Sequence, residues 1–339
     1  MKDEPPVPAP QLPVMLPWHA HGRERIASAM QGERLPHAIL LHGPRGVGKE
    51  IFAGALAAAL LCPNRGAALV ACGECAECAL SRAGSHPDLY RLRPLEEKKS
   101  ISVDQVREAC DQLGMTAMRH GHRIAVVAPA QAMTMNAQNA LLKTLEEPAP
   151  RTLLLLVTAR PSVLAPTLRS RCQRVEIARP TAEDALAWLA RQLGHPAPDG
   201  LLEIAGGAPL RALEIAPHFE ALEAQMTRLL DDLCAGRMEV TRCAEQMLGE
   251  GLPVRLDWLE AWFARALARR TLRHATRLTV PGGPLLQRVA AEVNISAAFR
   301  MVDRLREARR LLEGPAAAQL VMEAFLVEFT AAVGRRGVV

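Results

Sequence analysis

The first 180 residues alternate between short apolar runs and longer stretches with helical periodicity. Each run is bounded by polar or turn-forming residues and has the length of a buried strand rather than of a helix. The runs are Ala38–His42, Leu89–Arg93, Ile124–Val127, Leu153–Val157 and Val175–Ile177. Strands that alternate with helices in this way predict a parallel sheet with helices on both faces.

Three stretches between the runs carry helical signals. Residues Ser102–Gln105 form a capping box, in which the Ser and Gln side chains bond the first free N–H groups of a helix. Ala137–Glu147 carries its leucines on one side and stops at Pro148. Ile51–Cys62 is the longest apolar stretch, but it is shorter than a membrane span and contains Gly54, which predicts a buried helix.

The strand pattern stops after Pro180, and helical patterns take its place. Short helices are expected over 181–217, and long amphipathic helices follow from His218. The last of them, Pro315–Val333, is apolar around much of its circumference and is expected to pack in a core or against a subunit. A chain of 339 residues is too long for one compact core. We therefore predict a flexible Pro-rich segment 1–15, an α/β domain 16–179, a small helical domain 180–217 and a helical domain 218–339.

Composition narrows the class of protein further. Hydrophobic residues make up 49% of the chain but aromatic residues only 3%, so the cores should consist mainly of Leu, Ala, Val and Ile. A net charge of +5 permits contact with nucleic acid without requiring it. The first residues are acidic and then rich in proline, unlike a signal peptide, so we expect a cytoplasmic protein with no membrane-spanning segment.

The segment between the first apolar run and the first helix matches the G-x-x-x-x-G-K frame of a phosphate-binding loop. Its last position departs from the frame, because Glu50 stands where a Ser or Thr hydroxyl should ligate Mg²⁺. A carboxylate there would repel phosphate oxygens. An ordinary turn between a strand and a helix is the alternative, and the remaining glycines and lysine leave ATP binding open. The residues of this degenerate nucleotide-binding loop are Gly43, Gly46, Gly48, Lys49 and Glu50.

The second half of a nucleotide site is missing from the sequence. ATPases of this fold need an acidic residue at the end of a neighbouring strand to hold Mg²⁺ and orient water. Here the run Ile124–Val127 ends in Ala128 and Pro129, and no carboxylate lies between Asp111 and Glu146. Two losses at one site indicate a P-loop NTPase core that no longer hydrolyses ATP.

The eight cysteines fall into two sets. Cys62, Cys72, Cys75 and Cys78 have the spacing C-x9-C-x2-C-x2-C, which favours a closed, structural zinc site with four thiolate ligands. Four unligated thiols on a surface loop are the alternative. The remaining cysteines are scattered and are interpreted as small core residues; they are Cys110, Cys172, Cys234 and Cys243.

These motifs, taken in order, resemble one family. It comprises the delta-prime subunits of bacterial DNA polymerase III clamp loaders, which belong to the AAA+ class. The resemblance covers residues 16–215 well and the remainder only by length and helicity. It is carried by the four-cysteine insert together with Leu16–Trp18, Leu35–Pro44, His86–Asp88, Asn139–Pro148 and Leu168–Cys172.

The resemblance implies roles for several residues. Arg171 would be an arginine finger that reaches the γ-phosphate of ATP on a neighbouring subunit. Thr158 matches the sensor-1 position and Arg211 the sensor-2 position. The acidic pair of the ATPase subunits would fall on Ala128 and Pro129, so no catalytic residue of the chain's own is expected.

Without the resemblance, each of these residues has a simpler interpretation. Arg171 would be a surface arginine or a partner of Glu176. Thr158 would end a strand, and Arg211 would cap a helix.

The implied fold is an AAA+ P-loop domain over 16–179 with a zinc-binding insert at 62–78, a helical lid over 180–217 and a helical collar over 218–339. The implied function is that of a non-catalytic subunit in a five-membered ring with gamma/tau ATPase subunits and a delta subunit. Such a ring opens the sliding clamp and loads it on primed DNA. The rival hypotheses are an ATP-hydrolysing gamma/tau-type subunit and a zinc-dependent DNA-binding protein.

Overall fold

The computed structural model describes residues 11–333, apart from 272–294 and the single positions 33, 97, 120, 250, 313 and 315. The chain divides into two compact units, Met1–Arg179 and Pro180–Val339. The second unit contains both of the predicted helical domains, so their division at residue 217 stays a prediction. Most of the predicted flexible segment 1–15 lies outside the described residues.

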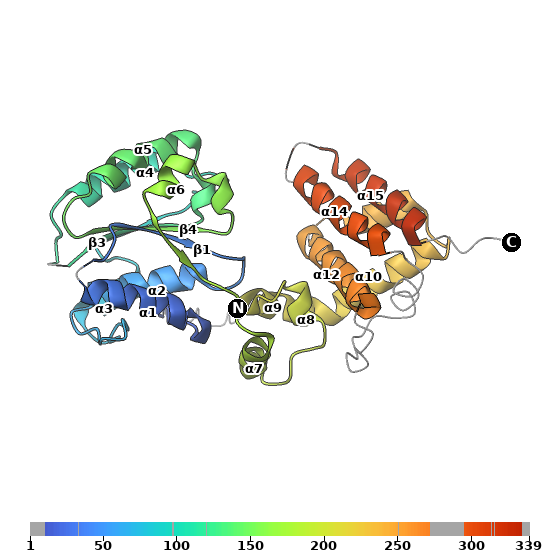
Figure 1. Ribbon diagram of the computed structural model, residues 1–339, viewed down its shortest axis with the longest axis horizontal. Coiled ribbons are helices and arrows are strands. Elements are labelled where there is room, and N and C mark those ends of the chain that lie inside the picture. Colours follow the sequence, from blue (N-terminus) through green and yellow to red (C-terminus); the bar gives the residue numbers. More distant parts are fainter. Residues whose placement is uncertain are drawn as a thin grey trace, which may run out of the picture. The chain divides into compact units, whose positions relative to one another are not determined.

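The first unit is built on a five-stranded parallel sheet with the strand order β2-β3-β4-β1-β5 (Figure 1). Each predicted run forms a strand, which confirms the α/β fold. The observed and predicted strand boundaries differ most at the edge strand β5. It begins two residues earlier than predicted, because polar residues suit an exposed edge. The strands are β1 (Ala38–His42), β2 (Leu89–Leu92), β3 (Arg123–Val127), β4 (Thr152–Thr158) and β5 (Gln173–Glu176).

Helices cover both faces of this sheet, as the alternating pattern predicts (Figure 1). One face carries α1 (Ala20–Gln31), α2 (Lys49–Leu61) and α3 (Ala76–Ala83), and the other carries α4 (Val103–Gly114), α5 (Met135–Glu146) and α6 (Pro166–Ser170). Short 3-10 turns lie at Pro17–His19, Ala130–Ala132 and Pro161–Val163. The buried core between the sheet and α4 and α5 is mainly aliphatic.

Capping residues set where α4 and α5 begin. The hydroxyl of Ser102 accepts the N–H of Gln105 at 3.3 Å, and the Gln105 side chain accepts the N–H of Ser102 at 3.0 Å, which confirms the capping box. Helix α5 begins at Met135 rather than at Ala137, because the hydroxyl of Thr134 caps it by accepting the Ala137 N–H at 3.2 Å.

The described part of the second unit is all helical (Figure 1). Helix α14 packs against both α12 and α15, and α11 packs on α15. The helices are α7 (Ala182–Leu193), α8 (Leu201–Ile204), α9 (Pro209–Ile215), α10 (Phe219–Cys234), α11 (Val240–Met247), α12 (Leu252–Thr271), α14 (Ile295–Leu312) and α15 (Ala318–Val333), with a 3-10 turn at Ala216–His218.

Aromatic side chains form the centre of this helical core. Trp258 and Trp262 stack with their ring centroids 6.3 Å apart, and Phe263 meets Phe325 and Phe329 edge to face at 6.4 and 5.8 Å. The expectation of cores made mainly from Leu, Ala, Val and Ile therefore misses the aromatic centre of the second unit. Composition averages over the whole chain, whereas α12 and α15 bring their aromatic residues to one place.

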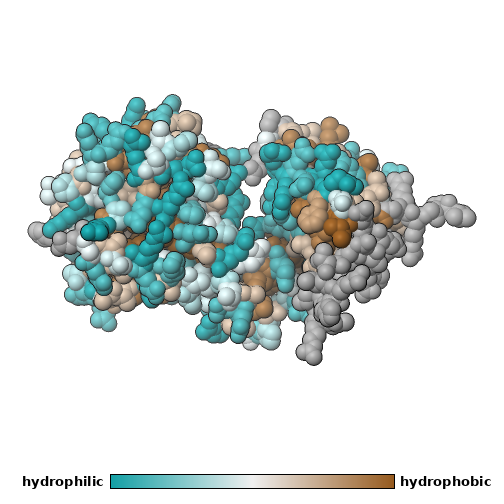
Figure 2. All heavy atoms as spheres, in the orientation of Figure 1, coloured by the Kyte–Doolittle hydropathy of each residue, from teal (hydrophilic) through white to brown (hydrophobic). Residues whose placement is uncertain are grey.

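Hydrophilic side chains dominate the visible face of the first unit, with apolar residues scattered among them (Figure 2). Among the helices that the structure describes, none combines the length and the apolar character needed to span a bilayer.

Candidate functional site

The phosphate-loop motif follows β1 directly and ends where α2 begins at Lys49. Gly43 has φ +153°, and a Cβ at this position would lie 2.2 Å from the backbone oxygen of Ile177. Gly48 has φ +79°, and its Cβ would lie 2.7 Å from the Leu16 side chain. Gly46 also has a positive φ, at 75°. The loop therefore requires glycine at both close contacts, because only glycine combines this backbone geometry with the absence of a side chain.

Lys49 is turned into its own loop. Its side chain is buried, and its ammonium group donates to the backbone oxygen of Pro44. Burial lowers the pKa of Lys49 to about 8. In this conformation the loop itself provides the partner for the lysine that normally contacts phosphate.

Glu50 has an ion-pair partner that nothing in the sequence pattern singles out. Its carboxylate lies 3.1 Å from Nη2 of Arg93, which directly follows β2. Both side chains are at least half exposed, so the pair contributes little to stability. It does balance the negative charge of Glu50, which the sequence presents only as a source of repulsion.

A neutral amide lies beside Thr158, the residue expected at the sensor-1 position. Thr158 ends β4 directly opposite His42 of β1, so it lies next to the start of the phosphate loop. Its hydroxyl donates to Oε1 of Gln131 at 2.6 Å and accepts the N–H of Arg160 at 3.0 Å. Gln131 comes shortly after β3, from which an ATPase would supply an acidic residue. In the sequence, the only signal for Gln131 is its position shortly after a predicted strand.

The segment before α1 fastens the phosphate loop from outside the motif. The backbone oxygen of Val47 accepts Nε1–H of Trp18 at 3.0 Å and Nε2–H of His19 at 2.9 Å. Nδ1 of His19 accepts the N–H of Leu16 at 3.1 Å, so the ring is the neutral tautomer with its proton on Nε2. His19 is fully buried, and burial lowers its pKa. The Leu16–Trp18 motif thus has a structural role in holding the loop.

The four clustered cysteines meet after the end of α2 and at the start of α3. All four sulfurs lie within 4.8 Å of one another, with Cys62 and Cys75 at 3.8 Å and Cys72 and Cys78 at 3.9 Å. Backbone N–H groups at Cys72, Gly73 and Cys75 point at cluster sulfurs from 3.4 Å. The arrangement can hold a metal ion.

The thiols of this cluster differ in acidity. The backbone N–H groups of Glu74 and Cys75 lower the pKa of Cys72 to about 6, because they stabilise the thiolate. Burial raises the pKa of Cys62 and of Cys78. Cys72 therefore loses its proton more readily than Cys62 and Cys78.

A partly buried polar network connects the cysteine insert to the sheet. Glu77 of α3 lies 3.0 Å from Nε2 of His86 and 2.9 Å from a guanidinium nitrogen of Arg119. Asp88, fully buried before β2, accepts the N–H of Arg119 at 3.0 Å and lies 3.4 Å from Nε of Arg123. The hydrogen bond from Arg119 is the main reason that the pKa of Glu77 is lowered. Of these residues, the sequence motifs include only His86 and Asp88.

The remaining cysteines lie apart from this cluster. Cys172, Cys234 and Cys243 are buried, which confirms their interpretation as core residues, and Cys110 is half-buried. Burial raises the pKa of Cys172 to about 11, as expected for an inert thiol.

Arg171 follows α6 and carries a side chain 37% exposed. Its Nη2 lies 2.7 Å from Oε1 of Glu146, so its ion-pair partner is Glu146 rather than Glu176. Gln173 of β5 pairs with Ile39 of β1, which lies four residues, or about 13 Å, before the phosphate loop begins at Gly43. Arg171 therefore lies near the amino ends of the strands, whereas its own phosphate loop lies at their carboxyl ends.

Arg211 belongs to α9 of the second unit. It forms an ion pair with Asp257 of α12, which also binds Nη1 of Arg309 in α14 at 2.6 Å. The side chain thus joins helices within the second unit rather than capping α9.

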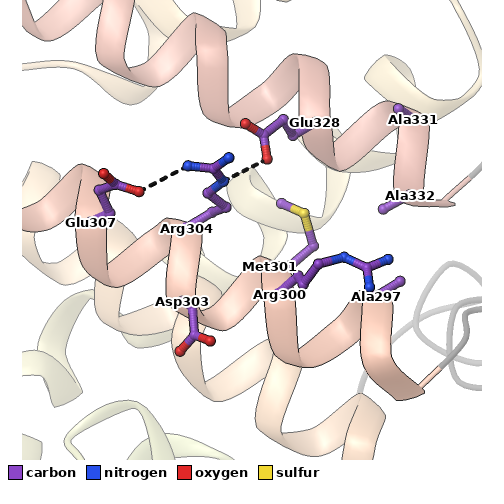
Figure 3. Close-up of a pocket in the computed structure, with 9 residues that line it drawn as sticks. All are labelled: Ala297, Arg300, Met301, Asp303, Arg304, Glu307, Glu328, Ala331 and Ala332. Carbon is purple, nitrogen blue, oxygen red and sulfur yellow. Dashed lines mark hydrogen bonds and ion pairs between the residues drawn. The ribbon is translucent and has the colours of Figure 1, made fainter.

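A pocket of about 690 Å³ in the second unit coincides with no predicted site residue (Figure 3). It lies between α14 and α15, where Arg304 is bound by Glu307 at 2.9 Å and by Glu328 at 3.0 Å. Charges of both signs line the pocket and several pair with one another, so they favour no one class of ligand.

The fold and the loop together define a class of protein. A parallel sheet with a glycine-rich loop and lysine between β1 and α2 is a P-loop NTPase core. Glu50 and the absence of a carboxylate after β3 make this core a degenerate one.

Comparison with known proteins gives the family. Residues 18–181 match the family model described as DNA polymerase III, delta subunit. The DNA polymerase III subunit delta' of Pseudomonas aeruginosa is 42% identical over 232 residues, 67% of this chain and 70% of that protein. The subunit delta' of Escherichia coli is 34% identical over 271 residues, 78% of this chain and 80% of that protein. The chain belongs to the family of DNA polymerase III delta-prime subunits.

Among solved structures, a DNA polymerase III gamma-subunit-related protein of Thermotoga maritima matches with a TM-score of 0.45 and 18% identity. The match covers 92% of this chain and 99% of that one.

The neutral state of His19 predicts a pH dependence of stability. Burial lowers the pKa of His19 in the folded state, so the unfolded chain takes up a proton first as the pH falls through about 6.5. Below that pH the free energy of unfolding falls, by at most about 1.4 kcal/mol per pH unit for this residue. His19→Gln keeps a donor for Val47 and does not titrate. Urea unfolding at pH 7.5 and at pH 5.5 measures the effect. Between these two pH values we expect the free energy of unfolding to fall less for His19→Gln than for the wild type.

The exposed residue His21 supplies the control for this measurement. His21→Gln should keep the pH dependence of the wild type. Burial also lowers the pKa of His86 and His122, but both residues are present in every protein compared. Equal pH dependence in the wild type and His19→Gln would contradict the prediction.

Proposed function

We propose that this delta-prime family member acts as a non-catalytic clamp-loader subunit of DNA polymerase III. Its partners would be the gamma/tau ATPase subunits, the delta subunit and, through the assembled ring, the sliding clamp and primed DNA. It would act in the cytoplasm, with 180–217 as a lid and 218–339 as a collar. Family membership supports the clamp-loader role, and the missing carboxylate after β3 supports a subunit without ATP hydrolysis.

Three features of the degenerate nucleotide site support the non-catalytic role. Lys49 donates to its own loop, Glu50 replaces the hydroxyl that would ligate Mg²⁺, and the side chain that meets Thr158 after β3 is the amide of Gln131 rather than an acid. A neutral amide does not neutralise Mg²⁺ and does not accept a proton from water. The rival hypothesis of an ATP-hydrolysing gamma/tau-type subunit needs that acid.

The position of Arg171 supports a role on a neighbouring subunit. The guanidinium lies near the start of β5, away from the carboxyl ends of the strands where its own phosphate loop lies. An exposed guanidinium there could reach only the nucleotide of another chain. The proposed sensor-like roles of Thr158 and Arg211 have weaker support, because Gln131 and Asp257 already bind these side chains.

Zinc is the metal that best fits the four-cysteine cluster. Zn–S bonds of about 2.3 Å in a tetrahedron place the sulfurs roughly 3.8 Å apart. The pairs Cys62–Cys75 and Cys72–Cys78 lie at 3.8 and 3.9 Å. Four thiolates would leave no open position for water, so the zinc would stabilise the insert and take no part in catalysis. The insert is joined to the sheet domain through Glu77, which argues against an independent zinc-dependent DNA-binding module.

The proposed function predicts that the isolated chain does not hydrolyse ATP. Glu50→Thr should not create turnover, because the acid that orients water would still be absent. The measurement is phosphate release by the wild type, Glu50→Thr and Lys49→Ala. Steady release by the wild type that Lys49→Ala abolishes would refute the non-catalytic role.

The metal proposal predicts one zinc ion per chain in protein purified without chelators. Cys75→Ser should lose the zinc and lower the midpoint of thermal unfolding, because a structural zinc contributes to folding. Elemental analysis and a thermal melt test both effects. Cys110 lies outside the cluster, so the control variant Cys110→Ser should retain one zinc ion per chain. Wild-type protein without zinc would contradict the proposal.

The finger proposal predicts a partial loss of activity in reconstituted complexes. Arg171→Ala should leave the ring assembled but lower the DNA-stimulated ATP hydrolysis of the partner subunits and the rate of clamp loading. A finger is worth about 10³–10⁵ in turnover at the site it serves, but only one site of the ring faces this chain. The exposed Arg174, with no ion pair among the described residues, offers the control variant Arg174→Ala. Unchanged rates in an assembled Arg171→Ala complex would indicate a purely structural arginine.

A further inference from the structure

We propose that Glu146 is a positioning residue that holds the guanidinium of Arg171 ready for a neighbouring subunit's ATP. The proposal rests on the proposed function of Arg171 as a finger, and it adds a residue that would not itself touch the nucleotide. Glu146 belongs to α5 and Arg171 follows α6, so the contact joins two separate elements that pack together.

Two acceptors hold the guanidinium from separate positions. Oε1 of Glu146 lies 2.7 Å from Nη2, and the backbone oxygen of Thr167 accepts Nη1–H at 3.0 Å. One acceptor would leave the guanidinium free to turn about a single bond, whereas two acceptors on different nitrogens fix its plane. Charge-assisted hydrogen bonds of this length are the stronger ones in proteins.

The carboxylate acceptor lies where a helix ends. Glu146 is the last residue of the twelve-residue α5, whereas Thr167 is the second residue of the five-residue α6. Backbone oxygens without helical partners give such ends a partial negative charge. A cation is therefore favoured at this place even before the carboxylate of Glu146 is counted.

The guanidinium keeps donors for a phosphate while it is held. An arginine side chain has five N–H donors, and the contacts with Glu146 and Thr167 use two of them. Three N–H groups remain, so contact with a γ-phosphate does not require the ion pair to break. The side chain of Arg171 is 37% exposed and that of Glu146 53% exposed, so another chain can reach the pair.

The neighbouring Glu147 provides a matched comparison. It carries the same charge, is exposed, and has no ion-pair partner among the described residues. If only negative charge near the finger mattered, removing either glutamate would have the same effect. A positioning role belongs to Glu146 alone.

The experiment uses complete clamp-loader complexes reconstituted with the wild type, Glu146→Gln, Glu147→Gln, Arg171→Ala and the double variant Arg171→Ala/Glu146→Gln. DNA-stimulated ATP hydrolysis is measured over a range of ATP concentrations, with complex mass as the check of assembly. At the affected site we expect Glu146→Gln to lower kcat roughly two- to fivefold, the factor that an exposed ion pair can supply, with KM little changed. The bulk loss should be smaller than that of Arg171→Ala.

The double variant separates positioning from a general effect on structure. If Glu146 acts through Arg171, the double variant should have the rate of Arg171→Ala alone, because the two effects are then not additive. Glu147→Gln should match the wild type. Thermal unfolding of isolated Glu146→Gln should also match the wild type, since exposed ion pairs add little stability.

The possible failures are distinguishable. Unchanged rates with Arg171→Ala would overturn the finger proposal and this one with it. If Arg171→Ala lowers the rate, the positioning proposal alone is overturned by any of three results. These are an unchanged or faster rate with Glu146→Gln, an equal loss with Glu147→Gln, and an additive loss in the double variant.

Discussion

Parallel pairing of the five strands is the constraint on which the arrangement of this protein depends. It puts the carboxyl ends of all strands on one side of the sheet and their amino ends on the other. The phosphate loop and Thr158 consequently lie together at the carboxyl ends, while Arg171 and Glu146 lie toward the amino ends. One sheet thus separates a degenerate nucleotide site from the residues proposed to serve another subunit.

The nucleotide loop keeps its shape through contacts within the protein. Trp18 and His19 both donate to Val47, and Lys49 donates to a backbone oxygen of the same loop. In an active P-loop the lysine contacts the phosphates. Here a backbone oxygen is the partner of Lys49, and Trp18 and His19 hold the loop from outside the motif, which explains how a loop without catalytic residues can remain well formed. The Glu50–Arg93 ion pair similarly balances a charge that would otherwise face the site alone.

Much of the fold and part of the site could be predicted because their signals are local. Apolar runs of strand length, the capping box at Ser102 and the loop glycines depend on neighbours within a few residues. The short spacings from Cys72 to Cys78 likewise fix how far apart the thiols can lie, and the structure brings them within 4.8 Å of one another together with Cys62. Backbone sterics and chain connectivity are enough for such features.

The tertiary structure alone decided which charged and aromatic side chains meet. Arg93 reaches Glu50 from 43 residues away, Arg211 reaches Asp257 from 46, and Arg171 pairs with Glu146 rather than with the nearer Glu176. A long charged side chain has many potential partners at similar sequence distances. Which of them it contacts depends on how whole helices and strands pack. The sequence by itself therefore determined the elements and the loop, whereas packing determined the contacts that give the loop and Arg171 their surroundings.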